Sequence, residues 1–341
     1  MNVPITEVLG CDEHGIEAAA ALLKAGRVVA IPTETVYGLA ANALNVAAVK
    51  RIFLVKGRPQ DNPLIVHISD LDMWAPLVAA LPKRALILAE AFWPGPLTII
   101  LPKSDLVPDV TTAGMDSVAV RMPAHPAARE IIRAAGVPLA APSANLSGLP
   151  SPTTAQHCLK DLQGKIPLIL DGGSCDVGIE STVVSLEGKP VLLRPGAITV
   201  SMLSKTLGEP VAIADAVERP LRAGERPTSP GMKYRHYAPK ARVILVESDL
   251  ASFIKLLNDA PEPKTYGLVF EGEQQLALKP CITYGRAHDA VSQNRELFAS
   301  LRQLDDCGAK LVYVRCPDRD GASLGVYNRM LRAAAFEVIK L

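Results

Sequence analysis

The sequence predicts an α/β protein of two domains, a larger one with a twisted mixed sheet and a smaller one that is doubly wound. The chain has 341 residues, more than one ordinary hydrophobic core contains. Short apolar runs typical of strands alternate along it with segments of helical spacing. A stretch rich in Pro, Gly and charge interrupts this alternation and has the composition of a linker. We therefore predict a domain at residues 1–209, a linker at 210–240 and a domain at 241–341.

In the first domain, β-branched apolar runs predict strands and wider periodic segments predict helices. The expected strands are 27–31, 64–68, 97–101, 117–122, 138–141, 168–170, 182–186 and 191–193. The expected helices are 47–55, 82–92 and 153–161, the last of which opens on a hydroxyl cap. Because the last strands follow one another without long helices, we expect a mixed sheet rather than a purely parallel one.

After residue 240, strands and helices alternate regularly. The expected strands are 243–246, 266–270 and 310–314, and the expected helices are 250–257, 290–304 and 324–335. This alternation predicts a small doubly wound, Rossmann-like domain. It carries no Gly-rich fingerprint, so we assign it no nucleotide.

Composition and charge argue against several classes of function. The net charge is only +1, whereas proteins held to nucleic acid by counterion release are much more basic. Aromatic residues, which stack on single-stranded nucleic acid, make up 4%. The six cysteines form no CxxC pair, which predicts reduced thiols in the cytoplasm. The N-terminus has no signal pattern, and no window approaches the roughly 18 apolar residues of a membrane span.

Two segments are candidate phosphate sites, although the sequence has no GxxxxGK[ST] loop and no GxGxxG after a strand. Lys56 and Arg58 flank Gly57 and precede Pro59, which favours a fixed anion-binding turn over mobile surface cations. The loop at 143–154 is dense in hydroxyls and runs into a helix, whose free N–H groups can complete a phosphate cradle. An ordinary Ser/Pro loop explains that segment equally well.

Three further features can contact a polar ligand, and each has a structural alternative. Thr33 and Thr35 follow a buried strand, but the loop 32–39 alone favours a turn capped by their own hydroxyls. Arg121 interrupts an apolar strand and needs an acidic partner, which we favour, or a bound anion. His67 lies on a strand and is expected to be a hydrogen-bonded core residue.

Turns at the ends of short strands supply the remaining candidates. These turns are 171–173, 178–182 and 194–196. Ser181 and Arg194 can reach one pocket if their strands are neighbours. Asp171 and Glu180 are candidate magnesium ligands, but loop carboxylates are common and we give this little weight.

Taken together, these segments resemble the YrdC-domain family. The matching stretches are PTETVYGL, KGRPQDNPLIVH, WPGPLT, VAVRMPAHP, APSANLSGLPSPTT, DGG with GIESTVV, and LLRPGAIT. The linker SPGMKYRHYAPKA is similar to that of the long form of the family, the L-threonylcarbamoyladenylate synthases with an appended C-terminal domain. The match covers about residues 15–240 motif by motif, and the shared order and spacing of the motifs make it specific.

The resemblance implies an enzyme that converts L-threonine, bicarbonate and ATP to L-threonylcarbamoyl-AMP and pyrophosphate, with magnesium bridging the ATP phosphates. Its L-threonine site would comprise Thr35, His67, Arg121, the backbone at Ala141, and Ser181. Its ATP site would comprise Lys56, Arg58, Asn62, Ser117, Ser143, Ser151, Arg194 and Tyr234, with Tyr237 as the alternative to Tyr234. We expect the turn at 56–58 to bind the polyphosphate and threonine to bind farther along the pocket. No protein nucleophile is expected, because the chemistry needs positioning and charge neutralisation.

The resemblance also implies a downstream partner, a tRNA threonylcarbamoyl transferase that modifies the adenosine beside the anticodon. Direct tRNA binding has only weak support from the charge. Residues 228–238 are expected to close over the pocket as a lid, because carbamoyl-adenylates hydrolyse readily; an exposed linker is the alternative. Two other functions remain as alternatives. One is a carbamoyl-transfer module like that of hydrogenase maturation proteins, whose CxxC pairs this chain lacks, and the other is an RNA-binding module.

Overall fold

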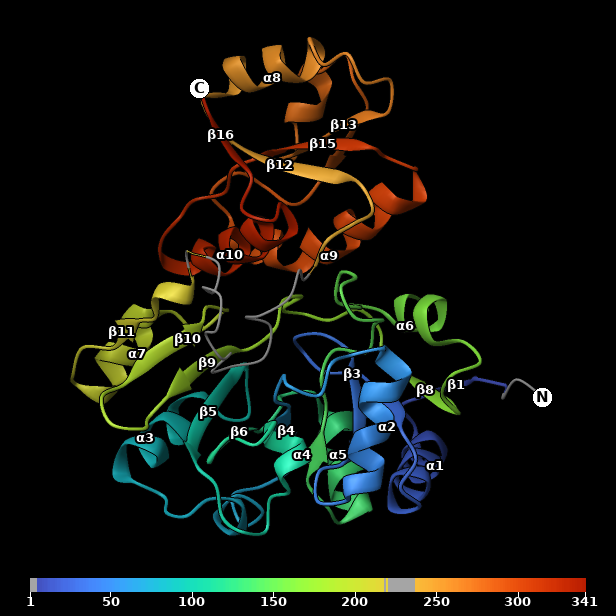
Figure 1. Cartoon of the computed structure of the whole chain (residues 1–341), viewed down its shortest axis with the longest axis vertical. Coiled ribbons are helices and arrows are strands. Elements are labelled where there is room, and N and C mark those ends of the chain that lie inside the picture. The colour runs from blue at the N-terminus through green and yellow to red at the C-terminus, as the bar shows by residue number, and fades with distance from the viewer. Residues whose placement is uncertain (1–4, 218, 220–236) are drawn as a thin grey trace.

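The computed structural model describes residues 5–217, 219 and 237–341, which form two α/β units (Figure 1). In the described residues the larger sheet has eleven strands in the order β1-β8-β2-β3-β7-β4-β6-β5-β9-β10-β11. Parallel and antiparallel neighbours are mixed within it. The smaller sheet has five strands in the order β14-β13-β15-β12-β16, all parallel. The predicted fold class is therefore confirmed for both units.

The larger unit contains more elements than the sequence predicted. Its strands are β1 (Glu7–Gly10), β2 (Val29–Ile31), β3 (Gly38–Asn42), β4 (Ile65–His67), β5 (Leu97–Pro102), β6 (Ser117–Arg121), β7 (Leu139–Ala140), β8 (Leu168–Asp171), β9 (Thr182–Ser185), β10 (Val191–Arg194) and β11 (Ala212–Ile213). Its α-helices are α1 (Glu13–Lys24), α2 (Val46–Lys56), α3 (Lys83–Phe92), α4 (Asp109–Thr112), α5 (Pro126–Ala135), α6 (Ala155–Leu162) and α7 (Val200–Leu207). Elements β1, β3, β11, α1, α4, α5 and α7 were not predicted. The loop after β2 ends earlier than expected, because Gly38 already pairs with Ile31 in an antiparallel ladder.

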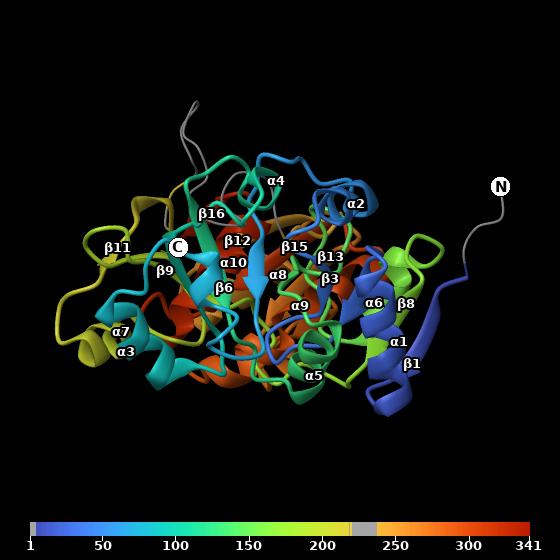
Figure 2. The ribbon, with the colours of Figure 1, turned by 90° about the horizontal axis from the view of Figure 1, so that it is seen from below.

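Helix caps fix the segments that border the later site. Asn45 accepts hydrogen bonds from the N–H groups of Ala47 and Ala48 and starts α2. Gly57 ends α2 at φ +60°, a conformation that favours glycine. Thr154 accepts a hydrogen bond from the His157 N–H at the start of α6, which confirms the expected hydroxyl cap. Figure 2 shows the packed pairs α1–α5 and α3–α7 at opposite ends of the sheet.

The smaller unit has helices on both faces of its sheet. Its strands are β12 (Arg242–Glu247), β13 (Thr265–Val269), β14 (Cys281–Thr283), β15 (Leu311–Arg315) and β16 (Val338–Lys340), and its α-helices are α8 (Leu250–Asn258), α9 (Ala290–Asp306) and α10 (Leu324–Ala333). Helix α8 covers the outer face, whereas α9 and α10 lie between the two sheets (Figure 1). The edge strands β14 and β16 were not predicted. No helix of the described chain is long and apolar enough to cross a membrane.

The two units share a continuous buried contact. Val36 and Ile179 of the larger unit belong to the same apolar cluster as Leu324 and Tyr327 of α10. The larger sheet also runs beyond the expected boundary at residue 209, because β11 pairs with β10. The division at 209 and 240 remains a prediction.

Candidate active site

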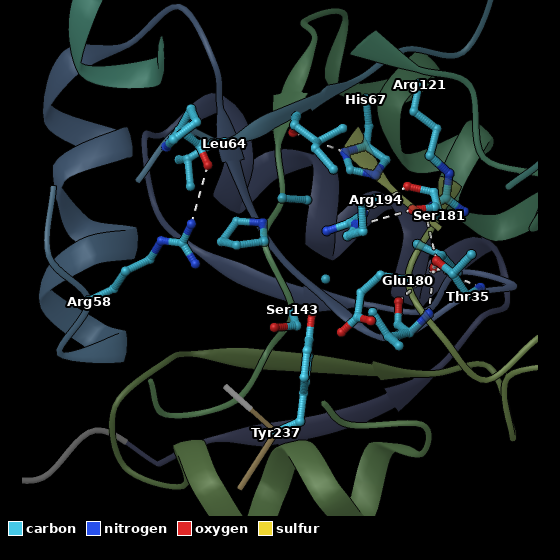
Figure 3. Close-up of a pocket in the computed structure, with 17 residues that line it drawn as sticks. Thr35, Arg58, Leu64, His67, Arg121, Ser143, Glu180, Ser181, Arg194 and Tyr237 are labelled. Carbon is cyan, nitrogen blue, oxygen red and sulfur yellow. Dashed lines mark hydrogen bonds between the residues drawn. The ribbon is translucent and has the colours of Figure 1, made fainter. Parts of the chain in front are cut away.

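A small cavity, partly open to solvent, lies against the larger sheet. It is lined by the loop after β2, by residues of β4, by the chain after β7, and by the ends of β6 and β10. Figure 3 shows Arg58 at one side, apart from Arg121, Ser181 and Thr35, which gather at the other. The cavity therefore has two chemically distinct ends.

Arg121, at the end of β6, is buried and engaged by three groups. Its Nη1 donates to Thr35 Oγ1 at 2.8 Å, and its Nε donates to the Gly95 carbonyl at 3.2 Å. Its Nη2 lies 2.6 Å from Glu34 Oε1 as an ion pair. Burial alone would raise the pKa of Glu34, but the Arg121 charge lowers it below its ordinary value. The favoured acidic partner is confirmed, and Arg121 lines the cavity as well.

The two threonines of the first loop have different roles. Thr33 Oγ1 accepts hydrogen bonds from the N–H groups of Thr35 and Val36, both at 3.2 Å, and donates to the Val36 carbonyl at 2.6 Å. The capped turn is therefore confirmed for Thr33. Thr35 Oγ1 also accepts from Arg121, and both threonines line the cavity.

Ser181 and Arg194 meet because β9 and β10 are antiparallel neighbours, which was the condition for a shared pocket. Arg194 donates from Nε to the Ser181 carbonyl at 3.0 Å and from Nη2 to Ser181 Oγ at 3.1 Å. Ser181 Oγ also lies 2.7 Å from Thr98 Oγ1. Burial lowers the pKa of Arg194 to about 10, so the guanidinium stays charged at neutral pH.

His67 is a buried, hydrogen-bonded residue, as expected, and it also lines the cavity. Its Nδ1 lies 3.2 Å from the Ile65 carbonyl, to which it can donate. Burial, with a smaller contribution from the Arg121 charge, lowers the pKa of His67 to about 3. The ring is therefore uncharged at neutral pH.

The two cations of the expected basic turn lie in different places. Arg58 lines the cavity and donates to the Asn62 and Pro63 carbonyls at 3.3 and 3.2 Å. Lys56 is buried outside the lining, where its Nζ donates to the Ser143 carbonyl and, at 2.6 Å, to the Asn145 carbonyl. Burial lowers the pKa of Lys56 well below its usual value. Lys56 thus ties α2 to the chain after β7, and its role toward ATP remains a prediction.

The other expected ATP residues are only partly brought together. Ser143 lines the cavity, as does Ala141 from the expected threonine set. Ser117 lines a small adjoining cavity, which shares its Pro63 and Leu64 wall with the main one. Asn62 is buried, and among the residues that the structure describes neither its side-chain nitrogen nor its side-chain oxygen has a hydrogen-bond partner.

The linker contributes Tyr237 to the cavity. Tyr237 is buried and lines the cavity, and its ring centroid lies 5.2 Å from that of Phe298 on α9. Tyr234 lies outside the described residues, as does most of the expected lid at 228–238. The choice between the two tyrosines therefore remains open.

Glu180 is a lining residue that sequence reasoning considered only as a metal ligand. Its Oε1 accepts from Ser151 Oγ, and its Oε2 accepts from Nε of Arg329 at 3.1 Å. Asp171 Oδ1 accepts from the Gly173 N–H at 2.9 Å. Within the described part of the chain, no group of three or more His, Cys, Asp or Glu side chains is placed to hold a metal ion.

Glu34 and Arg329 were not predicted as partners of the site. A signal existed for Glu34, because it stands next to Thr35 and an inward arginine requires an acid. No local signal could have found Arg329, which is 149 positions from Glu180 in the sequence.

A cavity rich in arginines and hydroxyls, in a mixed-sheet unit packed against a parallel one, defines a two-domain α/β protein with a pocket for small anionic ligands. Residues 21–196 match the Sua5, YciO and YrdC family model, described as Telomere recombination. Residues 198–335 match the model described as the C-terminal domain of threonylcarbamoyl-AMP synthase. The chain belongs to the threonylcarbamoyl-AMP synthase family and is an enzyme of nucleotidyltransferase type.

Relatives cover nearly the whole chain. The threonylcarbamoyl-AMP synthase of Pyrococcus abyssi is 44% identical, over 97% of this chain and 97% of its own. That of Bacillus subtilis is 42% identical, over 99% of this chain and 98% of its own. The crystal structure of P. abyssi Sua5 complexed with L-threonine matches with a TM-score of 0.91 at 42% identity, over 98% of this chain and 100% of that one.

Proposed function

We propose that this enzyme condenses L-threonine and bicarbonate with ATP to form L-threonylcarbamoyl-AMP and pyrophosphate. The observation that carries the proposal is the division of the cavity into two ends, with Arg121, Thr35 and Ser181 at one and Arg58 at the other (Figure 3). An amino acid and a polyphosphate need such separate binding sites. The amino-acid carboxylate and the phosphates are both negative and must lie apart while the carbamate attacks the α-phosphorus.

The first end suits L-threonine, the ligand of the solved P. abyssi relative. The planar fork of Arg121 can pair with the α-carboxylate. The hydroxyls of Thr35 and Ser181 and the backbone at Ala141 offer hydrogen bonds to the amino or carbamate group. The uncharged ring of His67 adds no positive charge next to the amine, which must lose its proton before it reacts.

The second end suits ATP. Arg58 and Ser143 line it, and Arg194 lies between the two ends as a further cation. The unpartnered amide of Asn62 is a buried group that a ligand would satisfy, since buried polar atoms are rarely left without hydrogen bonds. The adjoining cavity at Ser117 extends the space at this end. Lys56 and Ser151 would support this end from behind the residues that line the cavity. Tyr234 is included because the family resemblance implies it.

The reaction follows from positioning and charge. The free amine of threonine adds to the carbon of bicarbonate, water leaves, and a carbamate forms. A carbamate oxygen then attacks the α-phosphorus, and the bond to the bridging oxygen breaks, so that pyrophosphate leaves with the electron pair. Arg58 and Arg194 offset the charge that develops on the phosphates. Magnesium bound with ATP would supply further neutralisation, and the phosphates would be its main ligands, because Glu180 and Asp171 already have partners.

We further propose that a lid from the linker protects the product, which then passes to a tRNA threonylcarbamoyl transferase in the cytoplasm. Tyr237 reaches the cavity, and the Ala238 N–H donates to the Gly148 carbonyl at 3.1 Å, so the end of the linker is fixed at the pocket. A water-excluding cover favours a product that hydrolyses readily. All six cysteines are free thiols, which fits a reducing compartment.

Incubation with ATP, labelled bicarbonate and L-threonine tests the proposal. We expect pyrophosphate release that requires both threonine and bicarbonate, and label that appears in an adenylate separated by chromatography. Parallel reactions with D-threonine, or without bicarbonate, provide the controls. Pyrophosphate release that ignores either substrate would overturn the proposal.

A further inference from the structure

One arginine of the C-terminal unit is built into the wall of the cavity. Arg329, on α10, is fully buried. It donates from Nε to Glu180 Oε2 at 3.1 Å, from Nη2 to the Glu180 carbonyl at 3.3 Å, and from Nη1 to the Pro195 carbonyl. Arg329 therefore contacts two of the segments that line the cavity, the turn before β9 and the turn after β10.

The contact leaves no space between α10 and these turns. A Cβ added to Gly325 would lie 2.9 Å from Ile179 Cδ1 and 3.3 Å from the Gly196 Cα. Helix α10 thus packs against the Ile179 side chain and the Gly196 backbone, next to the turns that carry Glu180 and Arg194. Such an approach fixes the position of the Arg329 guanidinium relative to Glu180.

A second buried arginine holds the neighbouring part of the wall. Arg302, on α9, pairs with Asp161 of α6 at 2.7 and 3.1 Å and donates to the Pro150 carbonyl at 2.6 Å. The next residue, Ser151, donates its hydroxyl to Glu180 Oε1. The C-terminal unit therefore holds the segment at Pro150–Ser151 in two ways. Arg302 contacts it directly, and Arg329 contacts it indirectly through Glu180.

Charge explains why the contact at Glu180 matters for the reaction. Among the described residues that line the cavity, Glu180 alone is acidic, and it is buried. Without a counter-charge, a buried carboxylate is costly and repels a triphosphate. Its cationic partner comes from the C-terminal unit and is itself removed from solvent.

We propose that Arg329 is a positioning residue for the ATP end of the site, so that the C-terminal domain completes the active site electrostatically. It acts through Glu180, whose charge it neutralises and whose carboxylate it orients toward Ser151. This inference rests on the proposed function, because it takes ATP as the ligand. It gives the C-terminal domain a role in catalysis although that domain contributes no strand to the site.

Titration of the full chain with magnesium-ATP tests the inference. We expect Arg329→Gln to weaken ATP binding and raise the KM for ATP by about tenfold or more, because the buried carboxylate loses its partner. The KM for threonine should change much less. Glu180→Gln in the same chain removes the unpaired charge and should restore ATP affinity to within about threefold of wild type, since the two changes are strongly coupled. A role in packing alone would not be rescued by removing that charge.

Asn328→Ala is the matched control. Asn328 is buried on the same helix and donates to the Val217 carbonyl at 2.6 Å, so it anchors the two units away from the cavity. We expect ATP affinity to be unchanged in this variant. If Arg329→Gln fails to fold, the double variant Arg329→Gln/Glu180→Gln still tests the inference. ATP binding tenfold weaker in the double variant than in Asn328→Ala would overturn it. Wild-type enzyme that binds ATP but releases no threonine-dependent pyrophosphate would contradict the proposed function instead.

Discussion

The two α/β units differ in what occupies the ends of their strands. In the larger unit, side chains at the ends of β4, β6 and β10 line an open cavity. In the smaller unit, Arg315 at the end of β15 donates to the Ser248 carbonyl after β12 at 2.9 Å and lies 3.2 Å from Glu273 after β13. The crevice where doubly wound folds bind ligands is thus bridged by the protein's own side chains.

Aromatic rings also pack around Arg315 in the crevice of the smaller unit. The Arg315 guanidinium lies 5.6 Å from the Phe253 ring centroid and 5.8 Å from that of Phe270, and the Tyr284 hydroxyl donates to the Arg315 carbonyl at 2.5 Å. Fold class therefore does not locate a site. Arg121 and Arg194 also contact acids or carbonyls of their own chain, but a cavity is left beside them in which a ligand can be reached, whereas side chains of the smaller unit pack around Arg315.

The largest effect is expected from Arg121→Ala. This change removes the proposed partner of the threonine carboxylate, so threonine-dependent pyrophosphate release should fall by about 10²–10³-fold, while ATP binding at the proposed Arg58 end should be retained. Calorimetry with magnesium-ATP, beside the pyrophosphate assay, separates the two ligands.

Two further variants control for the buried Glu34. Arg121→Ala combined with Glu34→Gln removes the unpaired carboxylate and should recover stability without recovering threonine use. Arg133→Ala, an exposed arginine on α5, should change neither. If Arg121→Ala lost ATP and threonine binding equally, the division of the cavity into two ends would be wrong.

A smaller effect should separate Lys56 from Arg58. Lys56→Met leaves the Ser143 and Asn145 carbonyls without their donor, so we expect the free energy of unfolding to fall by about 2–4 kcal/mol. Arg58→Ala should instead raise the KM for ATP by about tenfold and change stability by less than about 1 kcal/mol. Chemical denaturation and initial rates give both quantities. If Lys56→Met weakened ATP binding without loss of stability, Lys56 would contact ATP directly.

The sequence could predict much of the fold and one end of the site. Apolar runs such as 97–101 and 243–246 are strands close to where their periodicity placed them, because burial on a sheet imposes that pattern. Strand β3 was missed because GLAAN has no β-branched or aromatic side chain to mark it. Edge strand β11 was missed because it is only two residues long and lies in a segment that looked like a linker.

The site was harder to predict wherever a role depends on contacts between distant segments. All five expected threonine-site residues line the cavity, because they stand at strand ends or in strand-end loops that the sheet brings together. Lys56 and Arg58 looked alike in the sequence, and only the position of the chain at Ser143 decides that the lysine is enclosed. Arg329 could not have been found, because its contact with Glu180 forms only where the two units pack together.

A still smaller effect should test whether the smaller unit's crevice is structural. Arg315→Leu removes the partner of Glu273, so we expect a loss of about 2 kcal/mol in the free energy of unfolding of that unit. ATP affinity should be unchanged, and titration should still give one ATP per chain. The exposed Arg295→Leu on α9 serves as the control. A second ATP site that disappears in Arg315→Leu would show that the crevice binds a nucleotide and would remove the contrast between the two units.

Per pH unit, the smallest effect is a pH dependence of stability that His67 should impose on the larger unit. Its pKa is lowered by burial from 6.5 to about 3, so below pH 6.5 the unfolded chain takes up a proton that the folded chain does not. The contribution of His67 is therefore constant above pH 6.5 and is lost as the pH falls toward 3, by about 1 kcal/mol per pH unit. His67→Gln should show a correspondingly shallower decline in urea denaturation between pH 6.5 and 4, whereas His14→Gln, on the exposed surface of α1, should keep the wild-type slope. Equal slopes in wild type and His67→Gln would mean that the ring takes up a proton in the folded enzyme as readily as in the unfolded chain. Below pH 6.5 the cavity would then carry one more positive charge beside Arg121 than we have assigned to it.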